Sequence, residues 1–131
     1  MTQPRPDDSL RDLVQGGAVT VPPEATLREA AVVMAREEIG AVVVVVEGRV
    51  GGVLSERDVV QAVANGDEVD DDRAEDVMAM EVVTASVDDT VAEAAQKMLE
   101  GSIRHLPVVD GDKVAGVVSI RDVLAAYCGA G

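Results

Sequence analysis

A repeating pattern of apolar residues divides the chain into short predicted strands and helices. After Thr26 and after Thr90, apolar side chains recur every three or four positions, a spacing that places them on one helix face. Residues 41–46 are apolar without interruption, which is typical of a strand buried on both faces. A Gly-containing turn and a second apolar strand follow. The predicted order is strand, helix, strand, strand, helix, and it occurs twice.

The predicted elements have matching bounds in the two halves of the chain. The first half is expected to hold strand 19–21, a helix after Thr26, strands 41–46 and 50–54, and a helix from Ser55. The second half is expected to hold strand 83–85, a helix after Thr90, strands 105–109 and 114–118, and a helix from Ser119. Short helical lead-ins are expected at 9–14 and 73–78.

Side-chain patterns also predict how these helices begin and which face they bury. Each first helix opens with a capping box, in which a Thr and the Glu three residues later bond to each other's backbone. The boxes pair Thr26 with Glu29 and Thr90 with Glu93. The last helix of each half is expected to bury an apolar stripe. These stripes are Val59, Val60 and Val63 in the first half, and Val123, Leu124 and Tyr127 in the second.

The second half of the chain repeats the first without a gap at a shift of 64 positions, which places Thr26 on Thr90. Such a register indicates two copies of one supersecondary unit, each too small to close its own core comfortably. We therefore expect an α/β (α+β) fold of two tandem β-α-β-β-α repeats packed about a pseudo-two-fold axis. The expected division is a disordered tail at 1–8, repeat 1 at 9–65, an acidic linker at 66–72, repeat 2 at 73–127 and a tail at 128–131.

Composition and charge exclude several classes of function. The net charge of −14 opposes binding to nucleic acid or to an anionic membrane, and an aromatic content of 1% removes the usual base-stacking platform. Cys128 is the only cysteine, so no disulfide within the chain and no cysteine-based zinc site can form. The polar N-terminus carries no signal peptide, and the longest apolar run is too short to span a bilayer. A soluble, cytoplasmic protein is expected.

The sharpest motif is Gly-Val-x-Ser-x-Arg-Asp, which occurs at 52–58 and 116–122, where a strand is expected to pass into a helix. Free N–H groups and the positive end of the helix dipole make such a junction a natural anion site. Its Ser can donate to a phosphate, its Asp can accept both hydroxyls of a ribose, and its Gly lets a ligand approach the backbone. The alternative is structural, because Ser at the N-cap and Asp three residues later also make a common helix start. Capping does not require the Arg.

Both halves resemble CBS (cystathionine-β-synthase-type) repeats, and together they resemble the paired Bateman module. The resemblance rests on 52–58, 116–122, Ile103-Arg104-His105-Leu106-Pro107-Val108-Val109 and the lead-in 75–78, and it covers roughly residues 9 to 127. It implies two clefts between the repeats that bind adenosine-containing ligands such as AMP, ADP or ATP. The motif Asp would hold the ribose, and the motif Ser, Arg104 and His105 would meet phosphates. The candidate ligand-binding residues are Ser55, Arg57, Asp58, Arg104, His105, Pro107, Ser119, Arg121 and Asp122.

The two halves depart from each other at one of these sites. Where the second half has Arg104-His105-Leu106-Pro107, the first has Gly40-Ala41-Val42-Val43, without the cationic pair and the Pro. We therefore expect unequal clefts, one with a phosphate clamp and one that is weak, empty or suited to a less anionic ligand. His105 can alternatively be structural, and Arg57 and Arg121 can alternatively pair with surface acids.

The sequence supports a regulatory ligand sensor over two alternatives. No required cofactor is expected, only a bound adenine nucleotide. Without a catalytic or transport domain, the signal would act through a separate regulated protein or through self-association. One alternative is a homodimeric scaffold that binds nothing small, and another is a sensor of S-adenosylmethionine or a dinucleotide. An enzyme is not expected, because no catalytic triad, Walker loop or dinucleotide fingerprint is present. The acidic linker lacks EF-hand spacing, so no metal site is expected.

Overall fold

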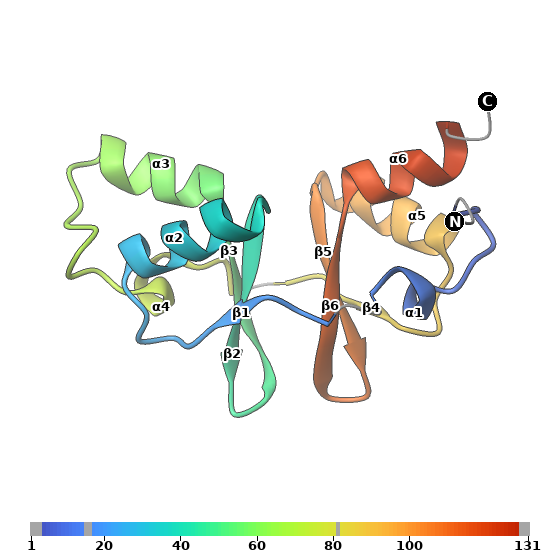
Figure 1. The fold of residues 1–131 in the computed structure, drawn as a ribbon, viewed down its shortest axis with the longest axis horizontal. Coiled ribbons are helices and arrows are strands. Elements are labelled where there is room, and N and C mark those ends of the chain that lie inside the picture. Colours follow the sequence, from blue (N-terminus) through green and yellow to red (C-terminus); the bar gives the residue numbers. More distant parts are fainter. Residues whose placement is uncertain (1–3, 15–16, 81, 129–131) are drawn as a thin grey trace. The chain divides into compact units, whose positions relative to one another are not determined.

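The protein is described from a computed structural model that covers residues 4–14, 17–80 and 82–128. These residues form two compact units that interleave along the chain. The first-repeat unit spans 19–82, and the second-repeat unit combines 1–18 with 83–131. Each unit has a three-stranded sheet and two long helices, drawn with their labels in Figure 1.

The first-repeat unit follows the predicted order of elements. Its elements are β1 (Thr20–Val21), α2 (Leu27–Glu37), β2 (Ala41–Val46), β3 (Arg49–Ser55), α3 (Glu56–Ala64) and the short α4 (Ala74–Val77). Strand β2 lies in the centre of the sheet, parallel to β1 and antiparallel to β3. The core forms where α2 and α3 pack on the sheet, and it buries residues such as Leu27, Val42 and Leu54.

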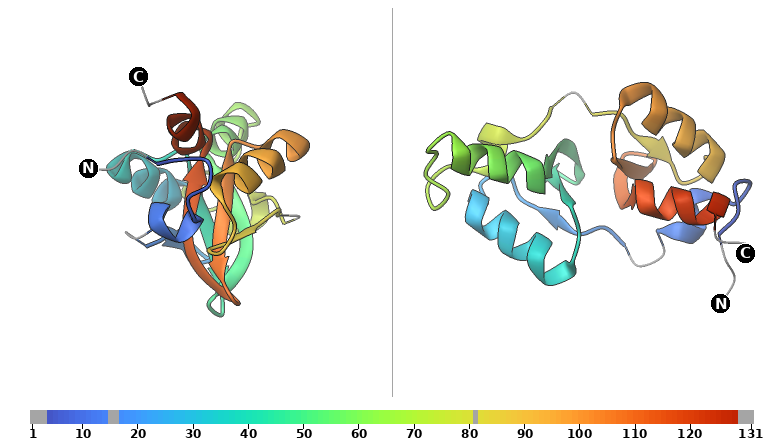
Figure 2. Two further views of the ribbon diagram at one scale, coloured as in Figure 1. Left: turned by 90° about the vertical axis from the view of Figure 1, so that its right-hand side faces the viewer. Right: turned by 90° about the horizontal axis from the view of Figure 1, so that it is seen from above.

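The second-repeat unit has the same topology at the same register. Its elements are α1 (Leu10–Leu13), β4 (Ala85–Ser86), α5 (Val91–Gly101), β5 (His105–Asp110), β6 (Lys113–Ser119) and α6 (Ile120–Cys128). The two long helices of each unit lie side by side (Figure 2). The predicted α+β architecture of two β-α-β-β-α repeats is therefore confirmed, with strand ends that move by one or two residues. The pseudo-two-fold relation between the repeats stays a prediction.

Each lead-in helix docks on the other repeat. In the second-repeat unit, the Leu10 N–H donates to the Asp89 carbonyl at 2.8 Å, and the Val91 N–H donates to the Asp8 carbonyl at 3.0 Å. The matching bonds of the first-repeat unit run from Ala74 to Ala25 at 2.7 Å and from Leu27 to Asp72 at 3.0 Å. The first N–H groups of α5 and α2, which have no acceptor within their own helix, are thus satisfied by the residues just before each lead-in helix.

Each lead-in helix therefore belongs to a different compact unit from the repeat that follows it in the chain. In the compact units, α1 groups with the second repeat and α4 groups with the first. Residues 4–8, from the expected N-terminal tail, form backbone hydrogen bonds within the second-repeat unit. The Ala92 N–H donates to the Pro6 carbonyl at 2.9 Å, and the Asp8 N–H closes a turn onto Arg5. Residues 1–3 lie outside the described residues.

The predicted apolar stripes of α3 and α6 need a correction. Val60 and Val63 are 66% and 58% exposed, and their counterparts Leu124 and Tyr127 are 52% and 51% exposed. The buried faces instead combine Val59 with Ala62 and Val123 with Ala126, which are spaced three residues apart. The alanines lie on the face that packs against the core, and the larger apolar side chains lie on the exposed face.

Candidate functional site

The Gly-Val-x-Ser-x-Arg-Asp motifs form two strand–helix junctions, β3–α3 and β6–α6. At the β3–α3 junction, Ser55 is the N-cap of α3, and its Oγ accepts from the Asp58 N–H at 3.1 Å. Asp58 Oδ2 in turn accepts from the Ser55 N–H at 2.8 Å and from the Ser55 hydroxyl at 2.9 Å. The β6–α6 junction repeats this box, and the three corresponding distances between Ser119 and Asp122 are 3.2, 2.9 and 3.0 Å.

These boxes confirm the structural alternative for Ser and Asp and also show what remains for a ligand. Each aspartate accepts from its Ser N–H and Ser hydroxyl through Oδ2, and no donor within the described part of the chain reaches Oδ1 of Asp58 or Asp122. A carboxylate oxygen accepts hydroxyl groups well. The Ser hydroxyls already donate to the aspartates, and a hydroxyl has one proton to donate. Contact between a phosphate and Ser55 or Ser119 would therefore replace that internal bond.

The motif glycines have a different role from the one predicted. They were expected to admit a ligand, but the lead-in segments occupy that space. A Cβ on Gly52 would lie 2.6 Å from the Met78 sulfur and 2.8 Å from the Ala79 carbonyl oxygen. A Cβ on Gly116 would lie 2.6 Å from the Cβ of Val14. Val53 and Ala79 also exchange backbone hydrogen bonds of 3.1 and 2.9 Å. The space beside Gly52 is therefore filled by another segment of the same unit.

The backbone of Arg104 and His105 lies beside the second motif, where β5 begins. The Ile120 N–H, in the first turn of α6, donates to the Arg104 carbonyl at 2.8 Å. His105 pairs with Ser119 across β5 and β6. Directly opposed residues of antiparallel strands share one sheet face. Pro107 pairs with Val117 on the same strands and is fully buried.

The equivalent positions of the first-repeat unit carry no cation. The Glu56 N–H donates to the Gly40 carbonyl at 2.9 Å, and Ala41 pairs with Ser55. Arg57 and Arg121 are exposed at matching places on α3 and α6. Neither of them, nor Arg104, forms an ion pair among the described residues, so pairing with surface acids is not seen there.

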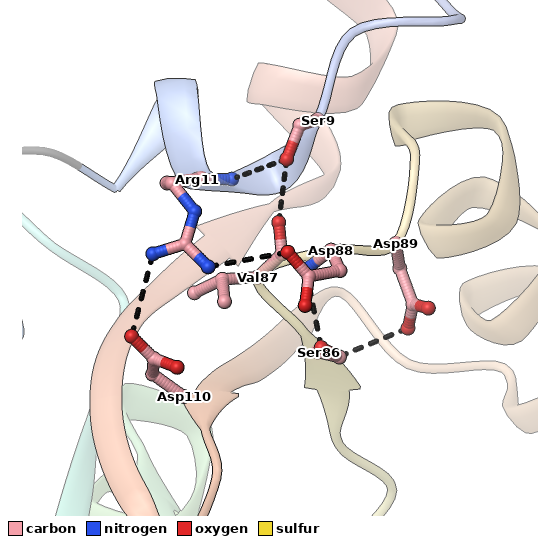
Figure 3. Close-up of polar contacts among 7 residues, drawn as sticks. All are labelled: Ser9, Arg11, Ser86, Val87, Asp88, Asp89 and Asp110. Atoms are coloured by element: carbon pink, nitrogen blue, oxygen red, sulfur yellow. Dashed lines mark hydrogen bonds and ion pairs between the residues drawn. The ribbon is translucent and has the colours of Figure 1, made fainter.

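A polar cluster that the sequence did not predict ties α1 to the second-repeat unit (Figure 3). The Arg11 guanidinium lies 3.1 Å from Asp88 Oδ1 and 3.3 Å from Asp110 Oδ2. The hydrogen bond to Asp88 and, to a smaller extent, the one to Asp110 raise the pKa of Arg11. The Ser9 hydroxyl adds a bond to the Val87 carbonyl at 2.6 Å. Arg11 follows Ser9 by two residues, so a polar helix start was visible in the sequence, but its distant partners were not.

The acidic linker is partly ordered by an ion pair with α2. The Arg28 guanidinium contacts both carboxylate oxygens of Asp70, and its Nη2 lies 3.2 Å from Oδ2. This hydrogen bonding raises the pKa of Arg28 and lowers the pKa of Asp70. Across 4–14, 17–80 and 82–128, no three His, Cys, Asp or Glu side chains are arranged to hold a metal ion. None of the helices described there has the length and apolar character to cross a membrane.

Comparison with known proteins defines the class to which this fold and these junctions belong. A model of the CBS domain matches the chain twice, at residues 10–65 and 74–129. The chain therefore belongs to the CBS domain family, and its two repeats make it a CBS pair, which confirms the resemblance seen in the sequence.

Individual relatives support this membership over most of the chain. The chain is 33% identical to the CBS domain-containing protein YhcV of Bacillus subtilis, over 88% of this chain and 82% of that protein. It spans about two thirds or less of several other curated relatives.

Two solved CBS structures were determined with ligands. The chain is similar to the CBS domain protein PAE2072 from Pyrobaculum aerophilum complexed with AMP, with 34% identity and a TM-score of 0.82 over 88% of this chain and 89% of that one. It is also similar to the CBS domain pair of protein MJ0100 in complex with 5′-methylthioadenosine and S-adenosyl-L-methionine. That similarity has 27% identity and a TM-score of 0.86, over 95% of this chain and 98% of that one.

Proposed function

We propose that this CBS pair is a regulatory sensor of adenosine-containing ligands, with AMP, ADP or ATP bound at the β6–α6 junction. The observation that carries the proposal is the unused Oδ1 of Asp122, held in place by the capping box beside Arg104 and His105. The carboxylate would accept the ribose hydroxyls, and the cationic strand end and helix N-terminus would attract the phosphate. The AMP complex of PAE2072 supports this ligand class.

The sensor would act by changing populations rather than by chemistry. A ligand that binds one conformation better than another shifts the protein toward it, and a separate protein could respond to that shift. We propose no catalytic role and no required cofactor. The cytoplasmic location expected from the sequence stays a prediction.

Binding can be tested by thermal denaturation and calorimetry with AMP, 2′-deoxy-AMP and GMP. We expect AMP to raise the melting temperature by mass action and 2′-deoxy-AMP to bind more weakly, because one ribose hydroxyl is missing. Asp122→Asn should reduce AMP binding, since its amide N–H groups cannot accept the hydroxyls. Asp12→Asn, an exposed change on α1, is the matched control. Absence of binding by any adenosine ligand at millimolar concentration would overturn the proposal.

A second candidate function, self-association as a homodimeric scaffold, is favoured by the outer faces of α3 and α6. Val60 and Val63 repeat as Leu124 and Tyr127 at the same helix positions, and all four are more than half exposed. Exposed apolar groups at repeated positions are typical of an association surface. Light scattering should give a dimer mass that Val63→Glu or Tyr127→Glu converts to a monomer. A monomer without any substitution would exclude this candidate.

A further inference from the structure

The two lead-in segments, residues 9–14 and 73–78, dock on surfaces that have the same backbone. The Arg11 N–H donates to the Val87 carbonyl of the second-repeat unit at 3.0 Å. The matching bond of the first-repeat unit runs from the Glu75 N–H to the Pro23 carbonyl at 3.1 Å. The other backbone bonds of the two lead-ins also correspond. Backbone bonds alone would therefore accept either lead-in on either unit, and any preference must come from the side chains.

The charged side chains favour residues 9–14 on the second-repeat unit. Arg11 contacts Asp88 and Asp110 there (Figure 3). The lead-in 73–78 carries Glu75 at the position that matches Arg11. Docked on the second-repeat unit, Glu75 would place a third carboxylate beside the two aspartates, and like charges at this distance repel one another.

The charged side chains of the first-repeat unit favour the other lead-in. The positions that match the two aspartates are Glu24 and Val46, so the guanidinium of α1 would meet one acid there instead of two. The ion pair between Arg28 and Asp70 would also be lost, because Pro6 stands at the position that matches Asp70. Exchange of the two lead-ins therefore removes attractive contacts on both units.

Buried side chains of the lead-ins differ in size between the two units. Leu10 and Ala74 occupy matching positions, and both are fully buried. Leu10 belongs to the same core cluster as Ala85, and Ala74 belongs to the same core cluster as Val21. Positions 85 and 21 also match, so each unit combines one large and one small residue. Exchanged lead-ins would overfill one core and leave a cavity in the other.

From these differences we infer that the docking surfaces are selective, so that charge and side-chain size assign residues 9–14 to the second-repeat unit and residues 73–78 to the first. The second-repeat surface recognises a segment in which a buried leucine precedes a cation. The first-repeat surface accepts a small residue followed by an acid. The backbone bonds hold the docked segment, and the side chains decide which segment it is. This selection requires no bound ligand and does not depend on the proposed function.

Amide hydrogen exchange of the whole chain reports on each docked lead-in separately. The Val91 N–H is bonded to the carbonyl of Asp8, just before α1, and the Leu27 N–H is bonded to the carbonyl of Asp72, just before α4. Release of one lead-in exposes one of these two amides to solvent, so its exchange rate measures how often that lead-in opens.

The first variant gives α1 the charged residue of α4. Arg11→Glu should speed exchange of the Val91 N–H about tenfold at low salt, because two attractive contacts become repulsive, and should leave the Leu27 N–H unchanged. Glu75→Arg is the matched control in α4. It should not speed exchange of the Leu27 N–H, because Glu24 is the charged residue on that surface. Melting curves of each variant check that the fold persists.

Reversal of the partner charges separates selection from general damage. Arg11→Glu combined with Asp88→Arg and Asp110→Arg should return exchange of the Val91 N–H to its original rate at low salt. Fast exchange that persists in the combined variant, or an unchanged rate in Arg11→Glu alone, would overturn selection by charge.

A double-mutant cycle tests selection by size. Leu10→Ala and Ala85→Val should each speed exchange of the Val91 N–H. The double variant, which has the residue pair of the first-repeat unit, should exchange more slowly than the product of the two single effects. Single effects that multiply without compensation would overturn selection by size.

Discussion

The β3–α3 and β6–α6 junctions are two solutions of the same local structure. Both place a Ser at the N-cap and an Asp three residues later, with hydrogen bonds that differ by no more than 0.1 Å between the two. They differ in the residue that precedes the strand beginning beside them, which is Arg104 before β5 and Gly40 before β2. Shared capping thus gives both junctions the same local backbone, and the residues at the start of the neighbouring strand are what distinguish them.

The attachment of the lead-in helices follows the same rule. The backbone bonds of α1 and α4 match one another, but the side chains around them do not. Arg11 binds Asp88 and Asp110, whereas the matching position of α4 holds Glu75, an acid in place of the cation. In the first-repeat unit, the ion pair is instead between Arg28 and Asp70.

The largest expected effects on stability come from the motif glycines. Gly52→Ala should lower the free energy of unfolding by about 2 kcal/mol, since overpacking costs about 1–3 kcal/mol. The new Cβ meets a backbone carbonyl 2.8 Å away as well as the Met78 side chain. Gly116→Ala should cost a similar amount, about 2 kcal/mol, because its Cβ meets the Cβ of Val14 at 2.6 Å and that atom is fixed to the backbone.

Urea denaturation of both glycine variants measures these losses. Gly101→Ala is the control, because its Cβ would have no neighbour closer than 3.6 Å. It should be neutral or slightly stabilising, since alanine favours a helix over glycine. Equal losses at 52 and 101 would show that the lead-in contact does not constrain the motif.

Removal of either N-cap should give a smaller loss that is the same in both units. Ser55→Ala and Ser119→Ala should each cost about 1 kcal/mol, because each leaves one helical N–H without its acceptor. Chemical denaturation followed by circular dichroism measures both. A loss confined to one variant would contradict the structural equivalence of the junctions.

The Arg11 cluster should contribute a small, salt-dependent stabilisation to the second-repeat unit only. Arg11→Gln is expected to lower the melting temperature slightly at low ionic strength and to have no effect in 1 M NaCl, where exposed charges are screened. The matched change Glu75→Gln in the first-repeat unit should cause no loss. A salt-independent loss for Arg11→Gln would point to packing rather than charge.

The smallest effect is an acid-dependent loss of stability in the first-repeat unit. Backbone and side-chain hydrogen bonds from Thr26 lower the pKa of Glu29, and Arg28 lowers the pKa of Asp70. Because the folded-state pKa lies below the unfolded value, this stabilisation is present above about pH 4 and is lost as the pH falls through the folded-state pKa. Melting curves from pH 6 to pH 3 should show a shallower decline for Asp70→Asn than for the unaltered chain.

Sequence periodicity predicted the elements of both repeats, because the apolar spacing and the Thr and Ser caps are local signals. It did not predict the exchange of the lead-ins, since Leu10 and Asp89 are far apart in the chain and no local pattern links them. The stripe of Val60 and Val63 was assigned to the core for a similar reason. Hydrophobicity marks apolar residues, but the rotation of α3 about its axis decides which of them are buried, and it buries Ala62.

The residues of the candidate site could be predicted from the sequence, but which of them lie next to each other could not. The motif Ser, Arg and Asp were visible as a repeated string, and the structure shows the hydrogen bonds within each motif. That Arg104 and His105 accompany Ser119 depends on the register of β5 with β6, which a sequence without a fold does not specify. The role of Gly52 was also hidden, because Met78 and Ala79 come from the far end of the same unit.

The most direct test of adenosine binding at the junctions is a titration of the ¹⁵N-labelled protein with AMP, followed by the backbone amide signals in NMR spectra. The account predicts that signals of 104–106 and 119–122 move first and saturate together, with smaller changes at 55–58. Signals that stay in place at both junctions while AMP binds elsewhere, or that do not change at all, would contradict it.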